Sequence, residues 1–451
     1  MLNAIMKRFD RCGDFVLRRF PSGDGEVCIC YIRGLADREY LSSRVIKPIM
    51  EQSGFDGDFT ACVQAFSVSP VNSADEAEKG LLDGQALAVF GARCCLINAS
   101  APEKRSPQEP DSDVTVRGPK IGFTEDGETS MALLRRTLRT PELKSETITV
   151  GTVTNTRVTI VWLNGRADDR LVSRIKAALE TAVARGLTDS GNIETLIGGA
   201  RLLPAFGSSE KTDKVASKLV AGRVGVICDG SPFVLTAPYV FAESLQSADD
   251  YYRTPWYASF MRILRLLALL ISVFLPGMFC AAYYHSPQTI PPAIYSSVLE
   301  LKEVLPLPLW AEVLAALTVF ELLREVGVRM PQRVGDAVGI VGSLILGDAA
   351  VSAGLIAPTT VMLVALAAVT AFIVPVFMYA SLIMRYLLVF IGAATGFPGI
   401  AAAAAVIICA MTAEDSFGTP YMKPIMPYSR KGMQDFLIAI PKKTLFRRED
   451  V

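Results

Sequence analysis

Three stretches in the second half of the chain contain no charged residue, and each is about long enough to cross a lipid bilayer as a helix. They comprise residues 266–284, 359–384 and 386–413. A helix needs about 20 apolar residues to span the hydrocarbon core of a membrane. Residues 1–255, by contrast, carry a charge every few positions. The sequence therefore predicts a membrane protein with a large soluble front half.

Composition agrees with this division and narrows the possible partners. The 451 residues are 51% hydrophobic, which is high for a soluble enzyme of this length. The formal net charge is zero, so nothing favours nucleic acid as a partner. No apolar run near the N-terminus is long enough for a signal peptide, so we expect the front half in the cytoplasm. The nine cysteines form no CxxC pair and no zinc spacing, which indicates small core residues in a reducing compartment.

The chain contains a single histidine, His285, and this excludes most catalytic and metal-binding arrangements. Catalytic triads and histidine-rich metal sites need an imidazole beside a partner. His285 follows the first apolar stretch, and we expect it in a polar loop. Asp189 and Asp229 stand beside glycines without a phosphate-binding loop, which is typical of turns. We therefore expect no enzyme, no cofactor and no metal site.

The soluble half contains a repeated pattern. VCICYIRGLADREYL at 27–41 resembles VTIVWLNGRADDRLV at 158–172, since each reads as a strand, then Gly-x-Ala-Asp, then a charged helix. GQALAVFGARCCLI at 84–97 resembles GRVGVICDGSPFVL at 222–235, where two short strands flank a turn. The same elements in the same order, twice, predict two related α/β subdomains.

In the second copy, Asp168 is expected to cap a helix whose apolar positions fall on one face: Leu171, Ile175, Leu179 and Val183. Between the copies, Thr129 is the expected cap of the helix that carries Arg135 and Arg136. We place the first cytosolic subdomain, with a proline-rich linker, at residues 1–143 and the second at 144–250.

A helical membrane domain is predicted at residues 251–413, followed by a basic cytosolic tail at 414–451. Arg253, Arg262 and Arg265 at the entry of the first apolar helix place that end in the cytoplasm, because positive residues favour the inner side. The tail is also rich in Lys and Arg. With both ends inside, the number of complete crossings must be even.

Five hydrophobic or amphipathic segments are visible, at 263–284, 309–329, 337–356, 359–380 and 386–411. One of them must therefore not cross completely. The second is amphipathic, with Glu312 and with Glu321–Arg324 and Glu325–Arg329 at helical pair spacing. The third is a candidate re-entrant or pore-facing segment. The sequence does not decide whether the second or the third segment is the one that fails to cross.

The third segment, GIVGSLILGDAAVSAGLIAP at 339–358, combines small residues with one acid. Small residues at helical spacing let helices pack closely in lipid. The helix-packing candidates are Gly339, Gly342, Gly347 and Gly354. Asp348 lies between these positions, and a carboxylate in the middle of a membrane costs at least about 2.5 kcal/mol, so it normally faces a partner or water.

Two interpretations of Asp348 follow. It is a buried structural acid, protonated or bonded to Ser352 one turn on, that ties helices together. Alternatively, copies of Asp348 from several subunits form an acidic ring along a cation path. In that case the hydrophobic neighbours Val341, Ile345 and Val351 are further candidates for the residues that line the narrowest part of the pore.

Six stretches between residues 80 and 440 carry a family pattern: EKRSPQEPDSDVTVRGPKIGFTE, LLRRTLRTPEL, TDKVASKLVAGRVGVICDGSPFVLTAP, SADDYYRTPW, FELLREVGVRMPQRVGDAVGIVGSLILGDAAVSAGLIAP and FGTPYMKPIMP. In these stretches the chain resembles the A subunits of spore germinant receptors (GerA type), a family that includes the stage V sporulation protein AF group. The fifth stretch is highly specific. At Asp348 the family commonly shows Gln or Glu.

The resemblance implies a multi-pass protein of the spore inner membrane, with the N-terminal domains and the C-terminal tail in the cytosol. It implies a homo-oligomer, a pentameric ring, that conducts monovalent cations. The expected partners are a transporter-like B subunit and a lipoprotein C subunit, or a small membrane protein if the chain is of the stage V type. The resemblance also implies that residues 320–358 supply the gate and pore, and that Arg117, Gly118 and Pro119 form a cytosolic signature.

The expected function is thus an oligomeric membrane subunit of the spore germination apparatus that forms a cation channel opened by nutrients. The alternative is a non-conducting membrane scaffold that assembles germinant receptor complexes. Composition does not separate the two, because both need apolar helices and a charged cytosolic part.

Overall fold

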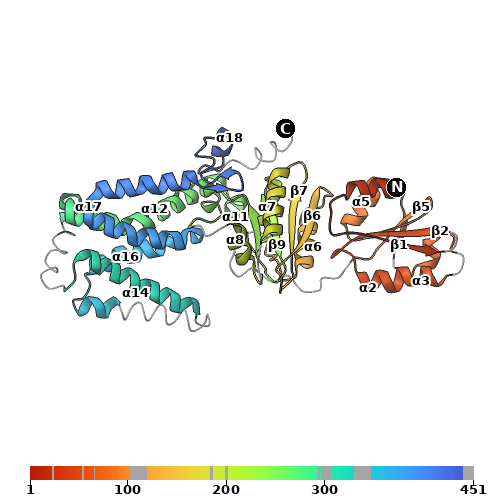
Figure 1. Cartoon of the computed structure of the whole chain (residues 1–451), viewed down its shortest axis with the longest axis horizontal. Coiled ribbons are helices and arrows are strands. Elements are labelled where there is room, and N and C mark those ends of the chain that lie inside the picture. Colours follow the sequence, from red (N-terminus) through yellow and green to blue (C-terminus); the bar gives the residue numbers. More distant parts are fainter. Residues whose placement is uncertain are drawn as a thin grey trace. The chain divides into compact units, whose positions relative to one another are not determined.

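The computed structural model describes residues 1–22, 25–52, 55–65, 67–100, 119–182, 186–198, 202–292, 295, 306–329 and 347–439. The chain forms two compact units. An α/β unit comprises residues 1–201, 205–239 and 416–418, and a helical unit comprises 202–204, 240–415 and 419–451. Figure 1 shows strands in the first and long helices in the second.

The first half of the α/β unit is built around a five-stranded antiparallel sheet with the order β1-β2-β4-β5-β3. Its strands are β1 (Phe15–Ser22), β2 (Gly25–Ile32), β3 (Val68–Pro70), β4 (Ala86–Phe90) and β5 (Arg93–Ile97). Its helices are α1 (Leu2–Arg8), α2 (Arg38–Tyr40), η1 (Leu41–Ile46), α3 (Lys47–Glu51), α4 (Phe59–Cys62) and α5 (Ala74–Leu82).

The second half repeats this plan, with the sheet order β6-β7-β9-β10-β8. Its strands are β6 (Leu143–Val150), β7 (Thr156–Leu163), β8 (Gly207–Ser209), β9 (Val224–Cys228) and β10 (Val234–Ala237). Its helices are α6 (Gly127–Thr137), α7 (Asp169–Thr181), α8 (Ser190–Gly198) and α9 (Thr212–Val220). Because each strand occupies the same place in both orders, the two halves share one topology, as the repeated sequence pattern predicts.

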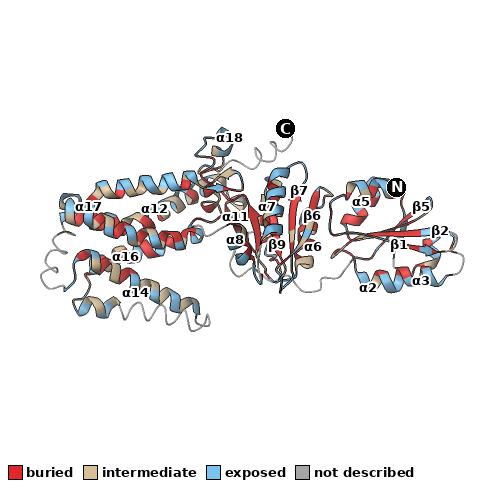
Figure 2. Ribbon diagram, viewed as in Figure 1, coloured by how far each residue is buried: buried red, intermediate tan, exposed pale blue. Residues whose placement is uncertain are grey.

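Helices cover both faces of each sheet, because each sheet presents apolar residues on both sides. In the second half, one core joins Ile160 and Trp162 to α7 through Ile175. The opposite core joins Val161 and Ile227 to α6 and α9. The first sheet likewise has two apolar cores. Figure 2 shows the buried residues of the α/β unit along the strands and on the inner sides of these helices.

The caps of two helices test local predictions from the sequence. Asp168 caps α7, with its side chain accepting the N–H of Arg170, and Leu171, Ile175 and Leu179 are buried, which confirms the predicted helix. Val183 lies outside the described residues. The prediction that Thr129 caps α6 was wrong, because Asp126 is the N-cap and accepts the N–H of Thr129. An ionised acid satisfies this orphan donor and also faces the positive end of the helix.

In the part of the helical unit that the structure describes, the long helices are α12 (Pro255–His285), α14 (Leu309–Arg329), α16 (Pro358–Ala371) and α17 (Met378–Ala413). Its shorter elements are α10 (Phe241–Ser244), α11 (Ala248–Tyr252), η2 (Pro287–Thr289), η3 (Pro375–Phe377), β11 (Asp415–Ser416), β12 (Thr419–Pro420) and α18 (Arg430–Met433). The tip of the β11–β12 hairpin, residues 416–418, belongs to the α/β unit.

Helix α17 is a hairpin rather than one continuous span. Its backbone breaks at Gly396, where φ is 73° and ψ is −157°. Phe241 contacts both ends of the hairpin, since its ring lies 5.6 Å from that of Phe377 and its N–H donates to the oxygen of Tyr421 at 2.9 Å. A straight helix of 36 residues would hold its ends about 54 Å apart. The two arms, residues 378–395 and 397–413, therefore fold back on each other.

His285 does not lie in a loop as predicted, but is the last residue of α12. Its Nε2 lies 3.0 Å from the oxygen of Ala393 in α17. A Cβ added to Gly396 would lie 2.9 Å from Cγ of His285, so the imidazole packs directly against the turn of the hairpin. The polar residues that follow it suggested a loop, whereas this packing holds the last turn of the helix.

Candidate pore segment and buried charges

The described part of the predicted pore segment is a short helix that ends in a glycine turn. Residues 347–352 are helical. The N–H of Gly354 donates to the oxygen of Val351 at 3.0 Å, and the N–H of Leu355 donates to that of Ala350 at 2.9 Å. Gly354 has a φ of 61°, so these two bonds form the Schellman motif that commonly ends helices.

Asp348 and Ser352 are exposed, and Val351 is half-buried. Among the described residues, no hydrogen bond joins Asp348 to Ser352. A Cβ added to Gly347 or Gly354 would meet no atom within 4 Å. Among the described residues, therefore, nothing packs over Asp348 or closely against these two half-buried glycines. The other predicted residues of this segment lie outside the described residues: Val341, Ile345, Gly339 and Gly342.

The segment is followed by a buried carboxylate contact. Oε1 of Glu312, in the first turn of α14, accepts the N–H of Ala357 at 2.6 Å. Ala357 is the N-cap of α16. Glu312 is 2% exposed, and its neighbours Leu309 and Val313 belong to an apolar core.

A second buried charge lies where α17 packs against α14. Arg385 is the sole charged residue between positions 359 and 413, and it is 1% exposed. Its Nη1 lies 3.9 Å from Oε1 of Glu321, whose Oε2 lies 2.7 Å from Nη2 of Arg324. Within the part of the chain that the structure describes, Nε and Nη1 of Arg385 have no hydrogen-bond partner. This cluster has two positive charges for one negative.

A third cluster surrounds the start of α12 and is balanced in charge. Arg262 is fully buried and donates to Oδ1 and the main-chain oxygen of Asp435, each at 2.9 Å. Arg265 donates to both carboxylate oxygens of Asp250, at 2.7 and 2.9 Å. Arg262 also lies 3.3 Å from Asp250. Two of the three arginines predicted to fix topology thus join α11, α12 and the tail.

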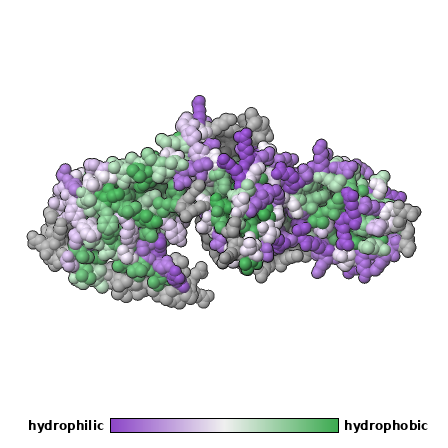
Figure 3. Space-filling view, viewed as in Figure 1, coloured by the Kyte–Doolittle hydropathy of each residue, from purple (hydrophilic) through white to green (hydrophobic). Residues whose placement is uncertain are grey.

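Within the described residues, two stretches are long and apolar enough to cross a membrane, α12 and Pro375–Ala413, which contains α17. Helix α16 is apolar but shorter. Figure 3 shows hydrophobic residues gathered over the surface of α12 and α17, whereas the surface of the α/β unit carries more hydrophilic residues.

The family model of the Bacillus/Clostridium GerA spore germination proteins matches residues 3–451. The chain belongs to the GerA family. It is 33% identical to spore germination protein KA of Bacillus subtilis, over 96% of this chain and 83% of that protein. It is 34% identical to spore germination protein GerLA of Bacillus cereus, over 79% and 73% of the two chains. The uncharacterised membrane protein YfkQ of Bacillus subtilis is 30% identical, over 97% and 88%.

Among solved structures, the N-terminal domain of the A subunit of the Bacillus megaterium spore germinant receptor GerK3 is 25% identical. The match covers 53% of this chain and 94% of that domain, with a TM-score of 0.39.

The GerA pattern LLRRTLRTPEL contains a residue that joins the two halves of the α/β unit. Nε and Nη2 of Arg135, on α6, donate to the two carboxylate oxygens of Asp14 at 2.7 and 2.8 Å. Nη1 donates to the oxygen of Thr140 at 3.0 Å. Beside this pair, the N–H of Gly13 donates to the oxygen of Ser145 at 2.9 Å. Sequence reasoning placed Arg135 on a helix and missed its partner, which is 121 positions away.

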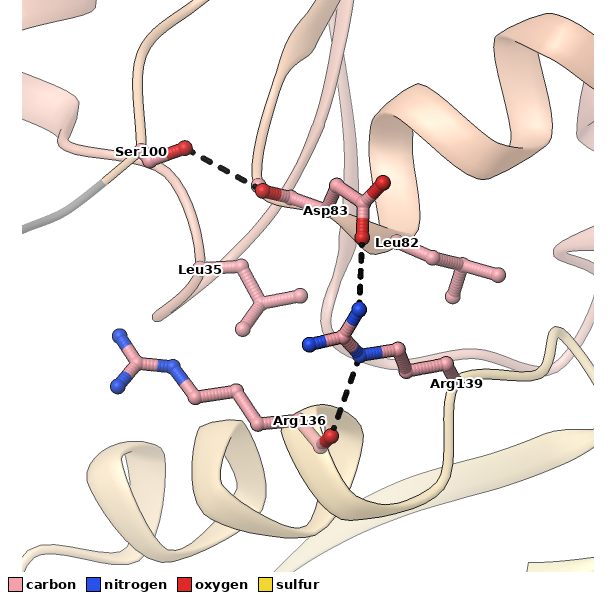
Figure 4. Close-up of a pocket in the computed structure, with 7 residues that line it drawn as sticks. Leu35, Leu82, Asp83, Ser100, Arg136 and Arg139 are labelled. Atoms are coloured by element: carbon pink, nitrogen blue, oxygen red, sulfur yellow. Dashed lines mark hydrogen bonds and ion pairs between the residues drawn. The ribbon is translucent and has the colours of Figure 1, made fainter.

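Arg136 and Arg139 line a pocket of about 170 Å³ in the GerA α/β unit, with Leu35, Leu82, Asp83, Gly84 and Ser100 (Figure 4). Nη1 of Arg139 lies 3.2 Å from Oδ1 of Asp83, and its Nε donates to the oxygen of Arg136. The side chains of this ion pair are 66% and 55% exposed, so water screens the pair and it contributes little stability. We assign no ligand to this pocket.

The predicted GerA signature is described in part. Arg117 and Gly118 lie outside the described residues, and Pro119 is exposed. All nine cysteines are free thiols, and seven are buried: Cys12, Cys28, Cys30, Cys94, Cys95, Cys228 and Cys280. Burial raises the pKa of Cys30 to about 12. These seven are core residues, as predicted.

Three charged residues in the GerA helical unit have contacts that sequence reasoning did not find: Glu312, Glu321 and Arg385. It placed Glu312 on the amphipathic segment and paired Glu321 with Arg324, as the structure confirms, but gave Arg385 no role. A charge inside an apolar stretch is a default signal of function or of a specific partner. That signal singles out Arg385, but only the structure supplies Glu321 as its neighbour.

Proposed function

We propose that this GerA protein is a membrane subunit of the spore germination apparatus and that several copies form a cation-conducting channel that opens when nutrients trigger germination. The proposal places the helical unit in the spore inner membrane and the α/β unit in the cytosol. The single observation that carries it is the exposure of Asp348 on a short helix within an otherwise apolar segment. In a bilayer, such an acid must face water or another copy of the chain.

The surface of α12 supports the membrane assignment. Exposed aromatic residues gather at its start, where Trp256, Tyr257 and Phe260 are 90%, 43% and 62% exposed. Trp and Tyr are enriched where a membrane helix meets the headgroups. Further along, Leu267 and Leu270 remain 50% and 44% exposed, as expected of side chains that face lipid or a neighbouring subunit.

The hairpin at Gly396 bears on the predicted topology. It divides the fifth apolar segment, 386–411. Residues 386–395 form the end of the first arm, and residues 397–411 form most of the second arm. The predicted segments then number six, an even number, and no segment has to be excluded to keep both ends in the cytosol. This supports a multi-pass arrangement.

The partners remain part of the proposal. They are further copies of this chain, in a pentameric ring, and either the B and C subunits of a receptor or the small membrane partner of the stage V type. Monovalent cations are the proposed permeant ions, because a ring of carboxylates favours cations.

The test is cation flux through liposomes that contain the purified full-length protein. The channel predicts flux of potassium and sodium over chloride, and a reduced preference for cations in Asp348→Asn. Glu51→Gln is the control, because this acid lies on α3 of the α/β unit in an exposed ion pair with Lys47. Assembled rings without flux would contradict the channel and favour the non-conducting scaffold.

A further inference from the structure

The segment that carries Asp348 is held at one end by a side chain from a different helix. All residues from 347 to 356 are exposed or half-buried, whereas Ala357, which follows them, is 1% exposed. The N–H of Ala357 donates to Oε1 of Glu312 at 2.6 Å. We infer that Glu312 is a positioning residue that fixes this end of the pore segment against α14. The inference rests on the proposed function, because it states how the same site is held.

The chemistry of a helix start explains why an acceptor is needed here. The first N–H groups of a helix have no partner within the helix. Ala357 has no side chain that can cap α16, and Pro358 at the first position has no N–H. In a capping box, a Glu or Gln three residues after the cap accepts the N–H of the cap residue. Thr360 stands at that position, so Glu312 takes this task from another helix.

The helix N-terminus adds to this contact. Helix N-termini carry a partial positive charge, which favours an acceptor oxygen nearby. Because Glu312 is 2% exposed, water cannot replace the contact without opening the core. A buried donor and a buried acceptor that lose each other both stay unsatisfied.

The position of Glu312 makes the contact an anchor. Its neighbours Leu309 and Val313 pack in one core with Phe279 of α12 and Val364 of α16. The end of the pore segment is therefore tied to three helices at once. A movement of α14 would be passed to Ala357, and from there to the short helix that carries Asp348.

The experiment compares Glu312→Ala with Glu312→Gln in the full-length protein. The amide oxygen of Gln accepts the same N–H without the charge, whereas Ala removes the acceptor. Hydrogen exchange of the peptide that contains Ala357, read by mass spectrometry in detergent, reports the contact directly. Glu51→Gln, in an exposed ion pair with Lys47 on α3, controls for the loss of an acidic side chain outside the pore segment.

We expect exchange at Ala357 to rise about tenfold or more in Glu312→Ala, because a buried N–H is left unsatisfied. Exchange in Glu312→Gln and Glu51→Gln should stay close to wild type. Cation flux in liposomes should follow the same order, with the Ala variant altered and the Gln variant retained. Unchanged exchange in Glu312→Ala, or equal losses in the Ala and Gln variants, would overturn the inference.

The two readouts separate this inference from the proposed function. If exchange follows the expected order while the wild-type protein conducts no ions, the positioning role stands and the channel fails. If exchange is insensitive to Glu312→Ala while Asp348→Asn changes the ion preference, the channel stands and the positioning role fails.

Discussion

Arg135 in the α/β unit and Arg385 in the helical unit are both buried, at 0% and 1% exposure, yet their surroundings differ. Arg135 donates twice to Asp14 and once to Thr140. Among the described residues, the nearest carboxylate oxygen to Arg385, that of Glu321, lies 3.9 Å away. A bidentate pair fixes both distance and orientation, whereas a loose pair fixes neither. The first is a rigid joint between two folded halves, and the second is a loose ion pair.

Arg262 shows that the apolar surroundings do not cause this difference. It is fully buried in the same helical unit as Arg385. Even so, it has partners in Asp250, Asp435 and the main chain at Phe436. The helical unit can therefore give a buried guanidinium several hydrogen bonds where the geometry allows it. The sparse set of described contacts around Arg385 is a property of that site.

We expect the largest effect on stability from removing the Asp14–Arg135 ion pair in the α/β unit. Arg135→Met leaves Asp14 buried without its partner, which should lower the free energy of unfolding by about 3–5 kcal/mol. Chemical denaturation of the full-length protein, followed by hydrogen exchange in β6 and β7, measures this. Arg139→Met is the control, because it removes an exposed pair and should cost less than about 1 kcal/mol. If the two variants lose the same free energy of unfolding, the buried Asp14–Arg135 pair is no stronger than an exposed pair, and its contrast with Arg385 fails.

Arg262→Met should cause the second-largest loss of stability. Asp435 would lose Arg262, while Asp250 would keep Arg265, so we expect a loss of about 2–4 kcal/mol, near the lower end for a broken buried pair. Thermal unfolding in detergent measures it. If this variant is as stable as wild type, the number of hydrogen bonds does not distinguish Arg262 from Arg385.

Glu321→Gln should have an intermediate effect. It removes the sole described carboxylate within 4.0 Å of Arg385 and leaves that guanidinium with less compensation. The looseness of the pair limits the expected loss to about 1–3 kcal/mol, below that of a tight buried pair. Glu325→Gln on the same helix should change stability by less than about 0.5 kcal/mol. A larger effect in the control would show that the charge of α14, rather than its contact with Arg385, matters.

The smallest effect is expected for Arg385→Met. Removing an incompletely bonded charge also removes its desolvation cost, and Glu321 keeps Arg324, so stability should stay within about 1 kcal/mol of wild type or rise. Thermal unfolding under the same conditions as for Arg262→Met gives the direct comparison. A loss as large as that of Arg262→Met would mean that Arg385 is a rigid joint after all.

The sequence predicted those features that depend on neighbouring residues. The repeat was visible because each copy places a strand, a Gly-x-Ala-Asp turn and a helix within fifteen positions. Asp168 was identified as a cap for the same reason. The wrong cap for α6 shows the limit, because both Asp126 and Thr129 are good capping residues and the pattern cannot order them.

Contacts between distant positions could not be predicted. The pairs Asp14–Arg135, Glu312–Ala357 and Glu321–Arg385 are set by how the elements pack, and no local pattern encodes them. The hairpin at Gly396 was missed for another reason. Residues 386–413 carry no charge, so hydrophobicity alone reads them as a single span, although a φ of 73° at Gly396 turns the chain back.

The most direct measurement of the central claim is cation flux through the Asp348→Cys protein, in a Cys409→Ser background, before and after a positively charged, water-soluble thiol reagent is added. Cys409 is the exposed native thiol and has to be removed. If Asp348 lies on a water-filled cation path, the reagent should reach the new thiol and block the flux. Flux that persists after complete labelling would contradict the account, as would a thiol that reacts only with lipid-soluble reagents.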